Sequence, residues 1–234
     1  MRVAALCDIH GNLPALEAVV PELDVDLVVV GGDVASGPFP AETLELVRSL
    51  PVPARFVRGN ADRVLDLEGI AEPNRSARLW VADRLGEENL RFLRELPLDA
   101  VIDGVHFCHG APASDTAPIT RLTSEERLRS LLVGVEERVV VCGHTHIQFD
   151  RTVNGMRVVN AGSVGAPWEV DPAAYWLELE DGEPRFRRTD YDVEEAARRI
   201  RASGYPSLGP LYEMLGSDPS RPQRMSELME AEFG

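Results

Sequence analysis

The chain has 234 residues, 44% of them hydrophobic, which is enough to build one well-formed core. It carries 24 Lys and Arg against 39 Asp and Glu, so its formal net charge is −15 and its pI is near 4.8. A surface this acidic repels polyphosphate backbones and anionic lipids, which argues against bulk nucleic acid and membranes as partners. No apolar run approaches the length of a membrane span.

The N-terminus and the cysteines indicate a cytoplasmic protein. The first residues lack the long apolar region of a signal peptide, because Asp8 follows a single short strand. The 3 cysteines, Cys7, Cys108 and Cys142, are an odd number without the spacing of a disulfide framework. We therefore expect free thiols in a reducing compartment.

Short apolar runs rich in β-branched residues recur along the chain, each bounded by Gly, Pro or polar residues. They predict strands over residues 2–7, 26–31, 54–58, 100–108, 138–142 and 157–160. Helical segments lie between them: Asn12 is placed to cap one helix, residues 40–50 form a second, and residues 123–126 offer a capping box for a third. This alternation predicts an α/β layered fold with much parallel pairing in its first part.

The pattern changes after about residue 150, where strands follow one another directly. They are predicted over residues 151–155, 157–160, 174–180 and 184–190, with Asn154-Gly155 and Asp181-Gly182 as hairpin turns. Residues 192–203 then form a helix capped by Asp192. Residues 208–215 are a further helical candidate, and four apolar residues there hint at a homodimer: Leu208, Leu211, Tyr212 and Leu215. No linker divides the chain, so we expect one domain over 1–234 with a helical C-terminal extension from about residue 191.

The polar residues that carry chemistry follow directly from predicted strands. Four of the 5 histidines do so, in short Gly-containing segments: His10, His109, His144 and His146. In open α/β sheets, the loops at the carboxyl ends of the strands are where ligands bind. The fifth histidine, His106, lies within a predicted strand and is interpreted as structural.

The segments at Asp8 and Asp33 each allow two interpretations. Asp8 and His10 leave an extended strand two residues apart and point the same way, which suits a chelate on one cation. An Asp at this position also commonly caps a helix or forms a turn. Asp33 emerges after Gly31-Gly32 at the end of an apolar strand, where its two oxygens can bridge two metals or can simply form a turn.

Two further segments offer nitrogen and amide ligands. Gly59-Asn60 normally signals a turn, yet the Asn60 amide oxygen can bind a hard cation and its NH₂ group can face a phosphoryl oxygen. His144 and His146 flank one Thr after a buried strand and a Gly. Histidines in a protein core are usually isolated, so this pair favours metal binding.

The order of these segments resembles the signature of the calcineurin-like metallophosphoesterases: Asp-x-His, Gly-Asp, Gly-Asn, His, then Gly-His-x-His. In particular, the chain resembles small single-domain bacterial and archaeal phosphodiesterases that carry Gly-Asn-x-Asp, which is Gly59 to Asp62 here. The resemblance implies a four-layer α/β/β/α sandwich of two mixed β-sheets flanked by helices. It also implies a dinuclear metal site at the carboxyl-end loops of the strands.

The resemblance further implies which residues hold the two divalent cations. The first set is Asp8, His10, Asp33 and His146. The second set, with Asp33 bridging, is Asp33, Asn60, His109 and His144. Mixed carboxylate, imidazole and amide ligands suit Mn²⁺, Fe, Ni²⁺ or Zn²⁺, and the resemblance makes Mn²⁺ the first expectation.

The expected activity is hydrolysis of small-molecule phosphodiesters, and also of monoesters. Cations about 3.5–4 Å apart lower the pKa of a bridging water, and the hydroxide attacks phosphorus in line with the leaving oxygen. The predicted catalytic residues are Asp33, Asn60 and His109, with the Asn60 amide stabilising the developing charge. The candidates for contact with substrate are Asn12, Asn60, Arg63 and Ser163.

The sequence departs from part of the family pattern. Relatives with Gly-Asn-His-Glu place that histidine near the leaving group, with an Asp as its expected partner, and these positions hold Ala61 and Ser36 here. Neither residue can act as an imidazole acid, so poor leaving groups such as protein phosphoserine should be cleaved slowly. We expect a preference for diesters or activated aryl esters.

Several alternatives stay open. A dinucleoside-polyphosphate hydrolase is a second enzymatic interpretation. A non-catalytic binding scaffold, like the retromer subunit that resembles this fold, is a third, although such a scaffold has no physical need for intact metal-position residues. Asp62 either orients a ligand from outside the site or caps a helix, and Trp168 either lines the pocket mouth or serves in packing.

Overall fold

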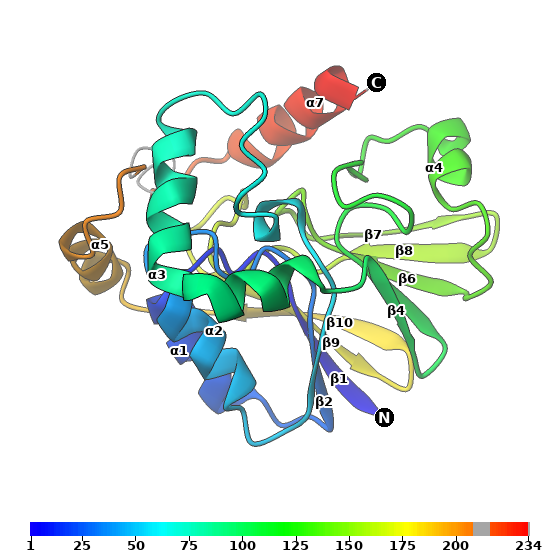
Figure 1. Cartoon of the computed structure of the whole chain (residues 1–234). Coiled ribbons are helices and arrows are strands. Elements are labelled where there is room, and N and C mark those ends of the chain that lie inside the picture. Colours follow the sequence, from blue (N-terminus) through cyan, green and yellow to red (C-terminus); the bar gives the residue numbers. More distant parts are fainter. Residues whose placement is uncertain (208–215, 234) are drawn as a thin grey trace.

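Two five-stranded β-sheets packed face to face form the centre of the computed structural model, which describes residues 1–207 and 216–233 (Figure 1). Helices cover the outer faces, so the layers run α/β/β/α as the resemblance implied. The helix predicted over 208–215 lies outside the described residues. So do the four apolar residues of the predicted dimer contact, Leu208, Leu211, Tyr212 and Leu215.

The first sheet has the strand order β10-β9-β1-β2-β3. Its strands are β1 (Arg2–Leu6), β2 (Leu27–Val30), β3 (Ala54–Phe56), β9 (Ala174–Glu180) and β10 (Glu183–Thr189). Strands β1, β2 and β3 pair in parallel, whereas β9 and β10 are antiparallel additions. Leu6 pairs with Val30 and Val30 with Phe56, so the three parallel strands end level with one another.

The second sheet has the order β4-β5-β6-β8-β7. Its strands are β4 (Asp99–Ile102), β5 (Val105–Cys108), β6 (Val139–Cys142), β7 (Phe149–Val153) and β8 (Met156–Asn160). Strands β5, β6 and β8 pair in parallel, between antiparallel edges β4 and β7. Phe107 pairs with Val141, so the residues that follow β5 and β6 emerge at the same edge.

The α-helices in the described ranges are α1 (Leu13–Val19), α2 (Pro40–Arg48), α3 (Asn74–Arg94), α4 (Glu125–Leu131), α5 (Val193–Ala202) and α7 (Arg221–Phe233). Helices α1, α2, α3 and α5 lie on the side of the first sheet, and α4 lies against the second (Figure 1). Asn12 and Asp192 cap α1 and α5 with their side-chain oxygens, as predicted. At α4 a capping box was predicted over residues 123–126, and the observed cap is Ser124, which accepts the Arg127 N–H. Across residues 1–207 and 216–233, no helix combines the length and the apolar character that a membrane span requires.

Alternation of side chains along the strands builds the layers. Leu6 of β1 belongs to the core beneath the helices, whereas its neighbour Ala5 packs between the sheets with Phe107 of β5. On the outer face of the second sheet, Val140 packs with Leu128 of α4. Strands buried on both faces therefore carry the near-continuous apolar runs from which the sequence predicted them.

The strand predicted over 100–108 is wrong in its extent, because β4 and β5 form a hairpin there. Asp103 and Gly104 make its turn with positive φ values of 51° and 75°, the conformation that favours Asp-Gly. The same signal correctly predicts the turns at Asn154-Gly155 and Asp181-Gly182, whose φ values are also positive. At the first hairpin the apolar residues on both sides of the turn imitate a single long strand.

Helix α3 is a second difference, since the strand-and-helix pattern did not predict it. Charged residues dominate this helix and hide its buried face, which consists of Ala77, Val81 and Leu85 at intervals of four. Gly86 then interrupts the helical backbone with φ 69° and ψ 171°, a conformation that glycine adopts readily. The spacing of four residues between these apolar positions was the sequence signal from which the helix could have been predicted.

Helix α7 is tied by polar contacts to α4 and to the loop that precedes it. Glu230 accepts hydrogen bonds from Thr120 Oγ1 at 2.6 Å and from Thr123 Oγ1 at 2.5 Å, and it forms an ion pair with Arg127 at 3.3 Å. Both threonines are buried. The carboxylate of Glu230 is therefore the acceptor that allows these hydroxyls to be buried beside the helix.

Removing this carboxylate should weaken the fold. We expect Glu230→Ala to lower the free energy of unfolding by about 1–3 kcal/mol, because two buried hydroxyls lose their carboxylate acceptor. Glu232→Ala, at an exposed position of the same helix, should change it by less than about 0.5 kcal/mol. Urea unfolding followed by circular dichroism measures both variants, and equal values for the two would contradict the role given to Glu230.

Candidate metal centre

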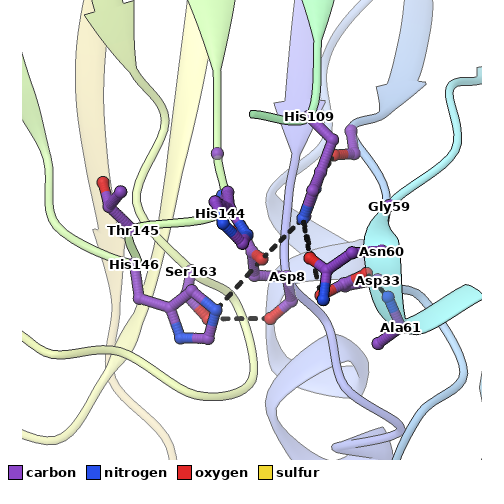
Figure 2. Close-up of polar contacts among 12 residues, drawn as sticks. Asp8, Asp33, Gly59, Asn60, Ala61, His109, His144, Thr145, His146 and Ser163 are labelled. Atoms are coloured by element: carbon purple, nitrogen blue, oxygen red, sulfur yellow. Dashed lines mark hydrogen bonds and ion pairs between the residues drawn. The ribbon is translucent and has the colours of Figure 1, made fainter. Parts of the chain in front are cut away.

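Polar side chains from five strand ends converge between the two sheets (Figure 2). Because the parallel strands of each sheet end level, the loops that follow them meet at one edge. The predicted ligands arrive on these loops: Asp8 and His10 after β1, Asp33 after β2, Asn60 after β3, His109 after β5, and His144 and His146 after β6. The structure thus brings all seven into one region.

The backbone of these loops is strained at the predicted ligands. Five of them have positive φ: Asp8 (53°), His10 (48°), Asp33 (53°), His144 (64°) and His146 (54°). A residue with a side chain pays roughly 1–2 kcal/mol for this conformation. Hydrogen bonds between loops hold it in place, because the His10 N–H donates to the Asp33 carbonyl at 2.8 Å and the Asp8 N–H to the Gly32 carbonyl at 3.1 Å. Such strain is characteristic of functional sites.

One group of ligand atoms surrounds Oδ1 of Asp8. His146 Nε2 lies 3.1 Å from this oxygen and His10 Nε2 lies 3.7 Å from it, while the two imidazole nitrogens are 3.2 Å apart. His10 Nε2 is also 3.7 Å from Oδ2 of Asp33. Asp8, His10 and His146 therefore present three ligand atoms close enough to hold one ion.

A second group surrounds Nε2 of His109. This nitrogen lies 3.5 Å from Oδ2 of Asp33, 3.9 Å from Oδ1 of Asp8 and 3.2 Å from the Asn60 amide oxygen. Asp33 thus reaches histidines of both groups, and so does Asp8. The His144 ring lies beside them, 5.0 Å from the His109 ring, with its Nε2 3.1 Å from a backbone carbonyl.

Backbone carbonyls fix the orientation of two of the imidazoles, those of His109 and His146. His109 Nδ1 lies 2.9 Å from the Gly31 carbonyl, and His146 Nδ1 lies 2.6 Å from the Ala166 carbonyl. A carbonyl can only accept, so Nδ1 carries the proton in each ring and donates it. An unprotonated Nε2 then directs its lone pair into the cluster, which is the arrangement that metal-binding histidines require.

This tautomer leaves Asp8 with an uncompensated oxygen. The side chain is fully buried, and Oδ1 has no hydrogen-bond partner among the described residues. The other oxygen, Oδ2, accepts the His144 backbone N–H at 2.9 Å. A buried carboxylate oxygen without a donor is costly, so the residues fit a divalent cation in the space that Oδ1 faces.

The electrostatics of the cluster favour positive charge. Burial alone would raise the pKa of Asp33, but the nearby His109 and His10 outweigh it and hold this pKa below its ordinary value. Burial lowers the pKa of His109, and the Asp33 and Asp8 carboxylates more than compensate, raising it to about 10. Burial and His109 together lower the pKa of His144 to about 4. His144 is therefore neutral at pH 7, the form that binds metals.

Asp62 joins the Gly-Asp loop to the Gly-Asn loop. It lies in a single 3₁₀ turn, Asn60–Asp62, and its carboxylate accepts three backbone N–H groups: Asp33 at 2.9 Å, Val34 at 3.1 Å and Gly59 at 2.8 Å. Burial and the Asp33 charge raise its pKa to about 7. Of the two interpretations drawn from the sequence, the geometry supports a carboxylate that positions ligand-bearing loops.

Two residues predicted to contact substrate are buried and already bonded. Asn12 Nδ2 donates to the Gly165 carbonyl at 2.8 Å, while its oxygen caps α1. Ser163 Oγ donates to the Asp8 carbonyl at 2.7 Å and accepts the Ala166 N–H at 2.8 Å. In this structure both side chains hold the loops beneath the cluster together.

Arg63 is bonded to acidic residues outside the predicted ligand set, whereas Trp168 packs against that set. Arg63 forms two contacts of 3.1 Å with the Asp115 carboxylate and one of 3.1 Å with Asp66. The Trp168 ring lies 4.7 Å from the His146 ring, and its backbone N–H donates to the His146 carbonyl at 3.0 Å. Trp168 therefore packs directly on a predicted ligand.

His106 and the cysteines lie outside the ligand cluster. His106 stands between Glu137 and Asp99, 3.1 Å and 3.0 Å from their carboxylate oxygens, which supports the structural role expected for it. The three cysteines are free and buried, as predicted. Burial raises the pKa of each thiol, so all three stay protonated and unreactive at neutral pH.

Replacing the Asp62 carboxylate tests its role in holding the loops. We expect Asp62→Asn to lower the free energy of unfolding by about 1–3 kcal/mol, because an NH₂ group would then face a buried backbone N–H. Asp83→Asn is the matched control, since Asp83 is 86% exposed on α3. Urea titration of both variants gives the comparison, and an Asp62→Asn protein as stable as the control would refute the role.

Comparison with known proteins places these features in a family. An uncharacterized protein of Methanocaldococcus jannaschii is 28% identical over 233 residues, which cover 87% of this chain and 93% of that protein. The crystal structure of a metallophosphoesterase from Sphaerobacter thermophilus matches with a TM-score of 0.76 and 25% identity, covering 92% of this chain and 98% of the other. A hypothetical protein from Pyrococcus horikoshii shares the fold with a TM-score of 0.81 and 20% identity, covering 93% of this chain and 98% of the other.

The match to a protein family covers most of the chain. The model of the calcineurin-like phosphoesterase superfamily domain matches residues 1–182. These residues include every strand end that carries a predicted ligand. The chain belongs to the calcineurin-like phosphoesterase superfamily and is a hydrolase that acts on phosphoric ester bonds.

Proposed function

We propose that this protein hydrolyses small-molecule phosphodiesters with the help of two divalent cations. The proposal rests on one observation: buried Asp8 and Asp33 meet inward-facing imidazoles, and Oδ1 of Asp8 has no donor within the described part of the chain. Membership of the superfamily supplies the class of activity. The arrangement of ligand atoms supports its dependence on metal.

The two ligand sets share Asp33 in this proposal. One cation is held by Asp8, His10, Asp33 and His146. The other is held by Asp33, Asn60, His109 and His144. When bound, the cations supply Lewis acidity toward water and toward the phosphoryl oxygens. Mn²⁺ is the proposed activating ion, because it suits a mixed set of carboxylate, imidazole and amide ligands.

The protein's own groups bind and orient the substrate. Asn60 directs its amide oxygen toward His109, 3.2 Å away, which leaves its NH₂ group as a donor for a phosphoryl oxygen. The Ala61 N–H donates to Oδ1 of Asp33 at 2.7 Å and so fixes the other oxygen toward the histidines. These contacts preorganise the site for charge that develops on the phosphoryl group.

Relatives with Gly-Asn-His-Glu have a histidine and its expected Asp partner at two positions where this chain has no imidazole acid. Ala61 and Ser36 stand there, and neither carries a proton that it can deliver to a leaving oxygen at neutral pH. The leaving group must therefore depart with little help. This favours aryl esters and other good leaving groups over the alkoxide of a phosphoserine.

The compartment and the nature of the substrate complete the proposal. Three buried free thiols suit a reducing environment, so we place the enzyme in the cytoplasm. The net charge of −15 disfavours long polyanions, so the substrate is a small molecule rather than bulk nucleic acid.

Without an imidazole acid to protonate the leaving oxygen, the enzyme should prefer substrates with good leaving groups. With Mn²⁺ added, we expect kcat/KM for bis(p-nitrophenyl) phosphate to exceed that for a phosphoseryl peptide by about 100-fold or more, the contribution that a general acid normally makes. Steady-state assays of both substrates at pH 7 measure the ratio. Faster turnover of the peptide would show that another group delivers the proton.

Activity should depend on the proposed ligands. We expect Asp33→Asn and His109→Ala each to reduce kcat on the aryl diester by at least about 100-fold, with circular dichroism showing that the fold survives. Elemental analysis should show less bound metal in both variants. Asp83→Asn, an exposed Asp on α3, should retain wild-type turnover and metal content.

Removal of metal tests the same proposal without mutation. Treatment with a chelator should abolish turnover of the aryl diester, and added Mn²⁺ should restore it, because no other group in the proposed site activates water. Turnover that survives in metal-free protein would refute the proposal. A fully metal-loaded protein without turnover on any phosphoester would instead favour a binding scaffold.

A further inference from the structure

A pocket of about 820 Å³ opens beside the proposed metal centre. Two of its lining residues also touch the cluster. The Asn60 amide oxygen lies 3.2 Å from His109 Nε2, and the Thr116 carbonyl lies 3.1 Å from His144 Nε2. The pocket therefore begins where the phosphoryl group binds in the proposed function, and its volume admits a group far larger than methyl.

Three apolar residues line the pocket and are called its apolar wall: Leu65, Leu67 and Ile70. Leu65 is exposed, and the other two are half-buried. Leu65 is 55% exposed although it is a large hydrophobic residue. A ligand that covers these side chains removes apolar surface from water, which favours its binding.

The charges around the pocket balance. Arg63 and Arg78 are offset by Asp66 and Glu68, so these four lining residues carry no net formal charge. Arg63 is already paired with Asp115 and with Asp66. Arg78 donates to the backbone carbonyls of Arg63 and Asp66 at 3.0 Å, which holds the wall in shape. A pocket with this balance offers little to a second phosphate group.

We propose that this pocket binds an uncharged apolar ester group of the substrate, of the size of an aromatic ring or larger. The substrate class is then a phosphodiester in which one ester group carries such a ring. The inference rests on the proposed function, because the phosphoryl group is placed at the metal cluster. It goes further by assigning the ester group to the wall of Leu65, Leu67 and Ile70.

The test compares phenylphosphonate with methylphosphonate on the Mn²⁺-loaded protein. Both carry the same phosphonate head, so the ratio of their dissociation constants reports the pocket alone. We expect phenylphosphonate to bind about tenfold tighter or more, since burial of a ring is worth at least that factor. Isothermal titration calorimetry measures both constants without any turnover. A ratio near one would overturn the proposal.

A variant of the wall makes the test specific. Leu65→Ser combined with Leu67→Ser should reduce the phenyl-to-methyl ratio about fivefold or more, because two apolar contacts are lost. Both positions are at least partly exposed, so the fold should tolerate the change. Val133→Ser is the control, since Val133 is 80% exposed and does not line this pocket. A double variant with the wild-type ratio would place the ring elsewhere and refute the assignment.

Failure of the proposed function would look different. In that case neither phosphonate binds detectably, or metal-loaded protein shows no turnover of any phosphoester. Failure of the pocket assignment alone leaves turnover of the aryl diester and binding of both phosphonates intact, with no preference for the ring.

Discussion

The structure depends on two carboxylates that are buried side by side. Asp8 is fully buried and Asp33 is 3% exposed, and both face Nε2 of the same histidine, His109. Burying an uncompensated carboxylate costs several kcal/mol, so the fold must supply positive charge near both. The imidazoles supply part of it, and a divalent cation would supply it more fully. The strained loops, the fixed tautomers and the carboxylate of Asp62 all serve to keep this pair in place.

The Gly-Asp and Gly-Asn loops approach each other more closely than side chains at their glycines would allow. A Cβ on Gly59 would lie 2.4 Å from the Asp33 nitrogen, and one on Gly32 would lie 2.6 Å from the Gly59 nitrogen. Asp62 uses this proximity, since one carboxylate reaches the N–H groups of both loops. The Gly-Asp and Gly-Asn motifs are therefore one structural unit. Their glycines permit the close contact, and the hydrogen bonds of Asp33 and Asp62 link the two loops.

The sequence predicted what is local and missed what depends on distant contacts. Asp33 and His109 could be predicted to lie together in the candidate site because each follows an apolar strand, and parallel strands deliver their ends to one edge. The sequence left the role of Asp62 open between two interpretations, because its partners become visible only when two loops meet. Asn12 was expected near substrate, yet its amide bonds Gly165, 153 residues away. Helix α3 was hidden for another reason: its apolar spacing is sparse and Gly86 interrupts it.

The cluster also joins the two sheets. Asp8 of the first sheet accepts the His144 backbone N–H of the second at 2.9 Å, and His109 of the second donates to the Gly31 carbonyl of the first at 2.9 Å. Each sheet thus supplies a hydrogen-bond partner that positions a predicted ligand of the other sheet. A cation bound between them would add to the packing of the inter-sheet core, and its binding free energy would then also be folding free energy. Displacing one sheet against the other would separate the ligands, which couples the geometry of the site to the packing of the whole sandwich.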